Sequence, residues 1–191
     1  MPTRIEPRAF PTAQVRRSLD ELPDTMDAST NPPDPSELYV VLGHERALDP
    51  NSTLFVGDRG SGKSFWSAAL NSRVTRALIH AQLPRLHLDR AETSWGFSVS
   101  TRNPDHPSRR VLQHLQRDHS AEDIWRAVVL RQLASRHDKP LPGREWSEVV
   151  AHVAEHPEHE ERVLNRISDR LAAGGKRHLL IFDALGRAGS D

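Results

Sequence analysis

The chain has 191 residues, 26 cationic and 26 anionic side chains, and no cysteine. Zero formal net charge gives no general electrostatic reason to expect nucleic acid or an anionic membrane as a partner, and the lack of cysteine excludes disulfides and thiol chemistry. No apolar run approaches the roughly 20 residues of a membrane-spanning helix. Residues 1–20 contain no apolar segment typical of a signal peptide. We therefore expect a cytoplasmic protein with no membrane partner.

The first 36 residues have the composition of a tail. Seven of the 14 prolines fall in this stretch, mixed with Ser, Thr, Asp and Arg, and few of its side chains could bury a core. A chain of this length can bury one sizeable core. We predict a disordered N-terminal tail over residues 1–36 and one folded domain over residues 37–191.

Residues 57–64 have the pattern G-x-x-x-x-G-K-S of a phosphate-binding loop. Its glycines can adopt positive backbone angles that turn several N–H groups toward one anion. Lys63 is a flexible point charge that can reach the outer phosphates, and Ser64 can offer its hydroxyl to Mg²⁺. The predicted nucleotide-binding residues are Gly57, Asp58, Arg59, Gly60, Ser61, Gly62, Lys63 and Ser64.

The segments around this loop have the order that such a loop requires. The apolar run Leu54–Val56 comes before it and predicts a strand, and residues 65–82 come after it and predict a helix. A helix N-terminus adds partial positive charge where phosphates would bind. The sequence therefore predicts a nucleoside-triphosphate site here.

A second element belongs to the same site. Leu179–Phe182 is an uninterrupted apolar run, as expected of a buried parallel strand, and Asp183 follows it directly. Ligands of open α/β sheets bind at the carboxyl ends of the strands. We therefore expect Ser64 and Asp183 to hold Mg²⁺ together.

The two segments resemble the Walker A and Walker B motifs of P-loop NTPases, most closely the AAA-, STAND- and KAP-type ATPases of the ASCE branch. The run from Asp183 to Arg187 is also similar to the D-x-L-D-R stretch of some of these ATPases. The resemblance implies an α/β fold: a three-layer P-loop sandwich with a mainly parallel sheet and a helical insertion between the two motifs. It also implies ATP and Mg²⁺ as cofactors, Lys63 and Asp183 as catalytic residues, and contacts between the base and residues 41–46.

Two departures from these families concern hydrolysis. Ala184 stands where many AAA-type sites have a glutamate, and Gly186 stands in place of the second acid of D-x-L-D-R. Residues 84–89 form a plausible second core strand. Because ATPases of the RecA type carry a water-activating glutamate after that strand, Glu92, or alternatively Asp89, is the candidate catalytic acid.

Three helices are predicted in the middle of the chain. Ser120 begins the first with a capping box, and a break at residues 140–143 separates it from the second, which Pro157 ends. The third stops at Gly174. The histidines and glutamates of residues 152–161 lack the zinc-protease helix pattern, so we predict solvated helix surface there and no zinc.

The leading functional hypothesis is an ATP-binding module, most simply a Mg²⁺-dependent ATPase of AAA/STAND-like type. Two alternatives remain: a non-hydrolysing switch or scaffold, and a small-molecule or nucleotide kinase. In the ASCE branch another strand lies between the two motif strands, yet the chain ends eight residues after Asp183. We therefore favour a truncated ATPase module over direct pairing of the two strands as in kinase–GTPase folds. Protein partners or self-association are compatible with the sequence.

Overall fold

The computed structural model describes residues 32–40, 42–58, 60–98, 106–183 and 185. Most of the predicted N-terminal tail, together with Val41, Arg59 and Ala184, lies outside the described residues. Within them the chain is a mixed α/β fold of seven α-helices and a two-stranded parallel sheet. The helices are α2 (Glu45–Leu48), α3 (Lys63–Asn71), α4 (Arg73–Gln82), α5 (Arg109–Leu115), α6 (Ala121–His137), α7 (Trp146–Glu155) and α8 (Pro157–Ala173); the strands are β1 (Ala91–Phe97) and β2 (Arg177–Phe182).

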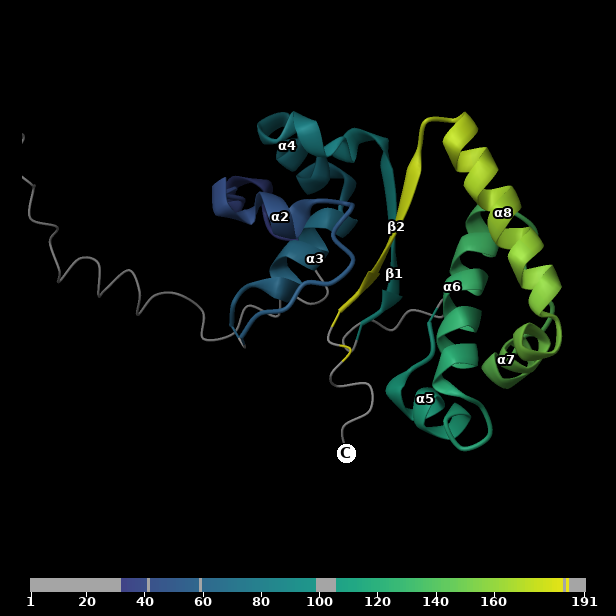
Figure 1. Ribbon diagram of the computed structural model, residues 1–191. Helices are drawn as coiled ribbons and strands as arrows, with labels where there is room; N and C mark the ends of the chain where they lie inside the picture. Colours follow the sequence, from purple (N-terminus) through teal and green to yellow (C-terminus); the bar gives the residue numbers. More distant parts are fainter. Residues whose placement is uncertain (1–31, 41, 59, 99–105, 184, 186–191) are drawn as a thin grey trace, which may run out of the picture.

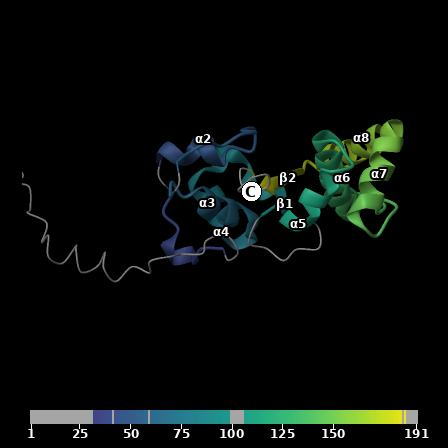
Figure 2. The ribbon, with the colours of Figure 1, turned by 90° about the horizontal axis from the view of Figure 1, so that it is seen from below.

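The sheet lies between two groups of helices, with α2, α3 and α4 on one face and α6, α7 and α8 on the other (Figure 1). A view turned by 90° shows the same separation (Figure 2). Parallel strands cannot be joined by a tight turn. The crossover from β1 to β2 is made by the segment that contains α5 to α8. The α/β class therefore agrees with the sequence prediction.

The two strands pair from Ala91 opposite Arg177 to Trp95 opposite Ile181, and a bulge then brings Phe97 opposite Phe182. Gly96 occupies the bulge. A Cβ at this position would lie 2.5 Å from the Phe182 ring, so no larger residue fits without displacing that ring. The backbone pairing extends one residue beyond β2: the N–H of Asp183 donates to the carbonyl oxygen of Phe97 at 2.9 Å.

Each face of the sheet has its own hydrophobic cluster. The larger one joins β1 to α5, α6, α7 and α8, and Trp125 packs its ring edge-to-face with both Phe97 and Phe182 at 5.8 Å. The smaller one joins α2, α3 and α4 to the turns around them. Its buried members are Leu38, Leu48, Trp66, Ala69, Ile79, Leu83, Leu86 and Leu88. Helices therefore lie on both faces of the sheet. Arg177 is exposed and the other residues of β2 are only partly buried, so the predicted burial of this strand is wrong.

The three predicted central helices are confirmed. The Ser120 hydroxyl accepts the Asp123 N–H at 3.1 Å, and α6 begins at the next residue, Ala121. α7 ends at Glu155, and Pro157 is the first residue of α8, where its missing N–H costs no helical hydrogen bond. α8 ends before Gly174. None of the helices in the described ranges combines the length and the apolar character needed to cross a membrane.

The predicted strand at Leu54–Val56 is wrong. These residues have no strand structure, and Leu54 and Val56 are 78% and 79% exposed. A strand needs a neighbour for its backbone groups, and in the described part of the chain β1 and β2 pair only with each other. Residues 54–56 lead into the loop over residues 57–64 as exposed chain without regular secondary structure.

The predicted strand at residues 84–89 is also wrong. This stretch forms two 3₁₀ turns, Pro84–Leu86 and Leu88–Arg90, and the strand begins only at Ala91. His87 separates the turns with a left-handed φ of 50°, which no strand residue adopts. In these turns both Leu86 and Leu88 pack in the smaller cluster.

The predicted helix over residues 65–82 is two helices. α3 ends at Asn71, and Ser72 has an extended ψ of 130° before α4 begins. The Thr75 hydroxyl donates to the carbonyl oxygen of Ala69 across the break. The sequence analysis also missed α5, which Ser108 caps by accepting the Val111 N–H.

Candidate functional site

The loop before α3 has part of the backbone geometry that the sequence predicts: Gly60 and Gly62 have a positive φ, and Gly57 does not. Gly60 and Gly62 have φ of 84° and 80°, in the left-handed region that favours glycine. α3 begins at Lys63, and Gly62 supplies no side-chain cap to it. The first N–H groups of an α-helix have no intrahelical acceptor, so an uncapped helix end favours an anion. Arg59 lies outside the described residues.

The Lys63 side chain folds back over this loop. Its Nζ donates to the carbonyl oxygens of Gly57 and Asp58 at 2.5 and 2.6 Å and to the Ser61 hydroxyl at 3.2 Å. The loop therefore curls around the ammonium group. Neutral oxygens are weaker partners for an ammonium than phosphate oxygens, which carry charge. A bound phosphate can therefore compete for Lys63.

Asp183 is buried directly after β2, with 7% of its surface exposed. Its backbone N–H bonds to Phe97, but among the described residues its carboxylate has no hydrogen bond or ion pair. Burying a charged group without a partner is costly, and such groups commonly pair with a ligand or a metal ion. The carboxylate is therefore available to a cation.

The loop and Asp183 lie toward the same end of the sheet. The Thr93 hydroxyl, in the first half of β1, donates to the carbonyl oxygen of Asn71 at the carboxyl end of α3. Arg76 bridges the same places, donating to Leu70 O and Thr93 Oγ1 at 2.8 Å each. α3 thus runs against the direction of β1, and its nine residues span about 13 Å, roughly the distance from Thr93 to Phe97 (Figure 1). Among the described residues, no hydrogen bond or ion pair joins Lys63 or Ser64 to Asp183.

The segment that the family resemblance assigns to the base also lies beside α3. The 3₁₀ turn Leu42–His44 leads into α2, and the His44 ring packs edge-to-face on Trp66 at 5.1 Å. Nδ1 of His44 is buried and has no hydrogen-bond partner among the described residues. Trp66 is 7% exposed, so this contact fixes the turn Leu42–His44 against α3.

The candidate acids Glu92 and Asp89 lie elsewhere. Glu92 is the second residue of β1, about 16 Å along the strand from Phe97. Its carboxylate accepts a hydrogen bond from Lys176 Nζ at 2.8 Å, which is the main reason that its pKa is lowered. Asp89 lies in a 3₁₀ turn and pairs with His80 at 3.5 Å. A water-activating role was assigned to these acids because they were predicted to follow the second strand. That reason is wrong, because Glu92 lies within β1 and Asp89 lies in a turn before it.

The structure gathers two histidines around Glu92 that the sequence analysis did not single out. Glu92 lies opposite His178 in the strand pairing. His137, the last residue of α6, has Nε2 2.7 Å from His178 Nδ1 and 4.0 Å from Glu92 Oε2. Burial, helped by His137 and Arg136, lowers the pKa of His178 to about 4, so this ring is neutral near pH 7. No local pattern could reveal the group, because its members are distant in sequence and meet through strand pairing.

We compared the chain with protein-family models, with curated proteins and with solved structures, and none of them matches it. A function for this chain is therefore supported by its own residues and their arrangement.

Proposed function

We propose that this chain is an ATP-binding P-loop module that uses Mg²⁺, of AAA/STAND-like type, built on the three-layer sandwich of that class. The observation that carries the proposal is the loop over residues 57–64. It turns through two left-handed glycines into an uncapped helix whose first residue is Lys63. That combination places backbone donors, a helix end and a mobile ammonium around one point.

The roles follow from the chemistry of the groups. The loop backbone and the start of α3 bind the phosphates, and Lys63 exchanges its contacts with Gly57 and Asp58 for contacts with the outer phosphates. Ser64 supplies a hydroxyl to Mg²⁺, and Asp183 supplies a carboxylate that the described residues leave unpaired. Residues 42–46, which the contact of His44 with Trp66 holds against α3, supply the contacts to the base.

In hydrolysis, water attacks the γ-phosphorus and ADP leaves with inorganic phosphate. Positioning and charge neutralisation by Lys63 and Mg²⁺ provide most of the catalysis in this class of reaction. With Ala184 following Asp183 in the sequence, the acid that orients this water is unassigned. That departure favours a second function, an ATP-dependent switch that binds nucleotide and does not turn it over.

The test is ATP binding by calorimetry, with and without Mg²⁺, followed by phosphate release from the same sample over hours. Lys63→Ala should weaken ATP binding at least tenfold, because a charge-assisted hydrogen bond contributes about 1.5–3 kcal/mol. Lys139→Ala is the matched control, since Lys139 is an exposed lysine on the other side of the sheet. ATP affinity in Lys63→Ala equal to that of the wild type would refute the site.

The two functions differ in the second measurement. Phosphate release that depends on Mg²⁺ and disappears in Lys63→Ala indicates an ATPase. Tight ATP binding with no release over hours indicates a switch. Asp183→Asn should abolish the effect of Mg²⁺ on affinity in either case, while weak Mg²⁺-independent binding remains.

A further inference from the structure

We propose that Glu92, His137 and His178 form a binding site for one Zn²⁺ ion at the amino end of the sheet. The site lies at the opposite end from the phosphate loop and does not depend on nucleotide binding. Two imidazoles and one carboxylate are a ligand set that zinc uses in proteins with a fourth position left for water.

The distances suit such an ion. One ligand atom from each of the three residues lies within 4.8 Å of the other two. Zinc bonds of about 2.0–2.1 Å in tetrahedral geometry place ligand atoms roughly 3.3 Å apart. The 4.0 Å between His137 and Glu92 exceeds that value, and the 2.7 Å between the two histidines is shorter. Shifts of under about 1 Å would equalise them, with the metal replacing the proton that the two rings now share.

Two of the three ligand atoms belong to groups whose other polar atom is already held. Nδ1 of His178 faces the site, and its Nε2 lies 2.8 Å from the Ser94 hydroxyl. Oε2 of Glu92 faces the site, and its Oε1 accepts the hydrogen bond from Lys176. Such outer contacts orient metal ligands and select the tautomer that presents a free ring nitrogen.

The three ligands come from rigid elements on one side of the sheet. Glu92 and His178 are paired residues of β1 and β2, and Ser94 continues the same face of β1. His137 ends α6, where Arg170 of α8 donates to its carbonyl oxygen. Thr93, between Glu92 and Ser94, points to the other face and bonds with α3 and α4.

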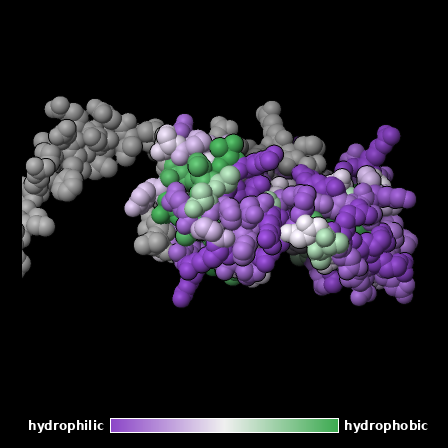
Figure 3. Space-filling model, turned by 90° about the horizontal axis from the view of Figure 1, so that it is seen from above, coloured by the Kyte–Doolittle hydropathy of each residue, from purple (hydrophilic) through white to green (hydrophobic). Residues whose placement is uncertain are grey.

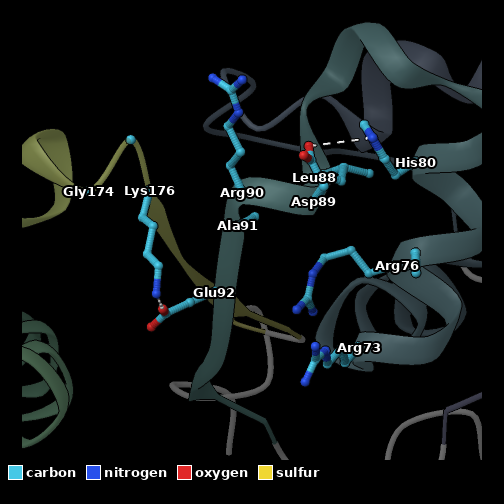
Figure 4. A pocket seen from close by; sticks show the side chains of 12 residues that line it. Arg73, Arg76, His80, Leu88, Asp89, Arg90, Ala91, Glu92, Gly174 and Lys176 are labelled. Atoms are coloured by element: carbon cyan, nitrogen blue, oxygen red, sulfur yellow. Dashed lines mark hydrogen bonds and ion pairs between the residues drawn. The ribbon is translucent and has the colours of Figure 1, made fainter.

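Solvent reaches the group through Glu92, whose side chain is 43% exposed. Glu92 and Lys176 also line a cavity of about 800 Å³ beside α4. Figure 4 shows their side chains pointing toward each other, away from Arg73 and Arg76 of that cavity. An ion can therefore enter from the solvent side, although the Lys176 ammonium competes with it for the Glu92 carboxylate.

The experiment is titration of the metal-free full-length protein with Zn²⁺ at pH 7.5, without nucleotide, against a chromogenic chelator. Co²⁺ serves as a second probe because its visible absorption reports tetrahedral coordination. We expect one ion per chain with a dissociation constant below about 10 µM. His137→Gln and Glu92→Gln should each weaken binding at least tenfold, as should His178→Gln.

The chain contains a matched control for adventitious binding by histidine. His152 stacks on His156 at 4.5 Å, and His159 lies 5.6 Å from His152, all at the junction of α7 and α8. The double variant His152→Gln/His156→Gln should keep the wild-type Zn²⁺ affinity. Loss of binding in this control, with binding retained in His137→Gln, would overturn the proposal.

Two other results would also overturn it. One is a dissociation constant above about 100 µM for the wild type, which would leave Glu92, His137 and His178 as a hydrogen-bonded network only. The other is wild-type affinity in both Glu92→Gln and His137→Gln. Circular dichroism of each variant controls for folding. If His178→Gln does not fold, the variants at Glu92, which is partly exposed, and His137, at a helix end, still decide the question.

Discussion

The two ends of the small sheet differ in how their polar groups are paired. At the amino end, Glu92 is held by Lys176, and His178 by Ser94 and His137. At the carboxyl end, Asp183 is buried with no side-chain partner among the described residues. Lys63, beyond it, bonds only to oxygens of its own loop within the described chain. The carboxylate of Asp183 is therefore free to bind a cation, whereas Glu92 and His178 at the amino end already have partners.

The two helical layers also differ, in the polarity of their exposed surface. In Figure 3 hydrophobic surface gathers over the half that contains α2, α3 and α4, and the half that contains α6 to α8 is mostly hydrophilic. The strongly exposed apolar residues of the first half are Tyr39, Leu54, Phe55, Val56, Val74 and Leu78. Larger exposed apolar patches mark interaction sites. The layer that carries the loop over residues 57–64 is thus also the one with exposed apolar surface.

The largest expected effect is on stability, and it should alter ligand binding at only one end of the sheet. Gly96→Ala places a methyl group against the Phe182 ring, which Trp125 holds from the other side. We expect a loss of about 2–3 kcal/mol in the free energy of unfolding from overpacking, measured by urea denaturation. ATP binding should weaken because Phe182 precedes Asp183, while Zn²⁺ binding at the amino end should persist in the folded fraction.

Gly43→Ala is the control for this substitution, because nothing lies within 4 Å of a Cβ at residue 43. It should change stability by less than about 0.5 kcal/mol. Equal stability of Gly96→Ala and the wild type would mean that the Phe182 ring moves freely, and that the two ends are not separated by a rigid contact.

The next effect has opposite signs at the two ends. Asp183→Asn removes a charge that has no partner among the described residues at a mostly covered position, so we expect a gain of at most about 1 kcal/mol in stability together with loss of the Mg²⁺ effect on ATP binding. Glu92→Gln breaks a partly exposed ion pair with Lys176 and should lose at most about 1 kcal/mol. Thermal and urea unfolding of both variants measure this. A destabilised Asp183→Asn would mean that the carboxylate already has a structural role.

Ser120→Ala tests a site remote from both ends. It removes the side-chain acceptor for the Asp123 N–H at the start of α6, so we expect a loss of about 1 kcal/mol. Ser168→Ala, at an exposed position inside α8, should be neutral. Both variants should bind ATP and Zn²⁺ as the wild type does. Altered Zn²⁺ binding in Ser120→Ala would show that the amino-end cluster depends on the whole length of α6.

The smallest effect is a pH dependence away from either end. The carboxylate of Glu148 accepts the N–H groups of Arg144 and Glu145, and these bonds lower its pKa below the ordinary value. The unfolded chain then takes up this proton at a higher pH than the folded chain. The contribution of Glu148 to stability is therefore complete above the ordinary pKa and is lost as the pH falls through the folded pKa.

Melting temperatures of wild type and Glu148→Gln between pH 7 and pH 3 measure this contribution. The two proteins should differ most near pH 7, and the difference should shrink toward pH 3. A difference that stays constant over this range would mean that the cap does not depend on the charge of Glu148.

The sequence by itself determined the features that rest on neighbouring residues. The Ser120 cap, the boundary at Pro157 and the stop before Gly174 were all predictable, because capping and proline sterics act within a few residues. The apolar run before Asp183 identified β2 for the same reason, although the residues of this strand are only partly buried. The phosphate-loop pattern predicted the left-handed glycines at residues 60 and 62.

Tertiary structure alone decided which apolar segments became strands. Leu54–Val56 looks like a strand locally but finds no partner in the described sheet, whereas residues 91–97 contain Glu, Thr, Ser and Gly and become β1 because β2 pairs with them. Strand formation depends on a neighbour distant in sequence, and so does the meeting of Glu92, His137 and His178. Local chemistry therefore predicted helix ends, one strand and the left-handed conformation of Gly60 and Gly62, and long-range pairing determined the sheet and the groups assembled on it.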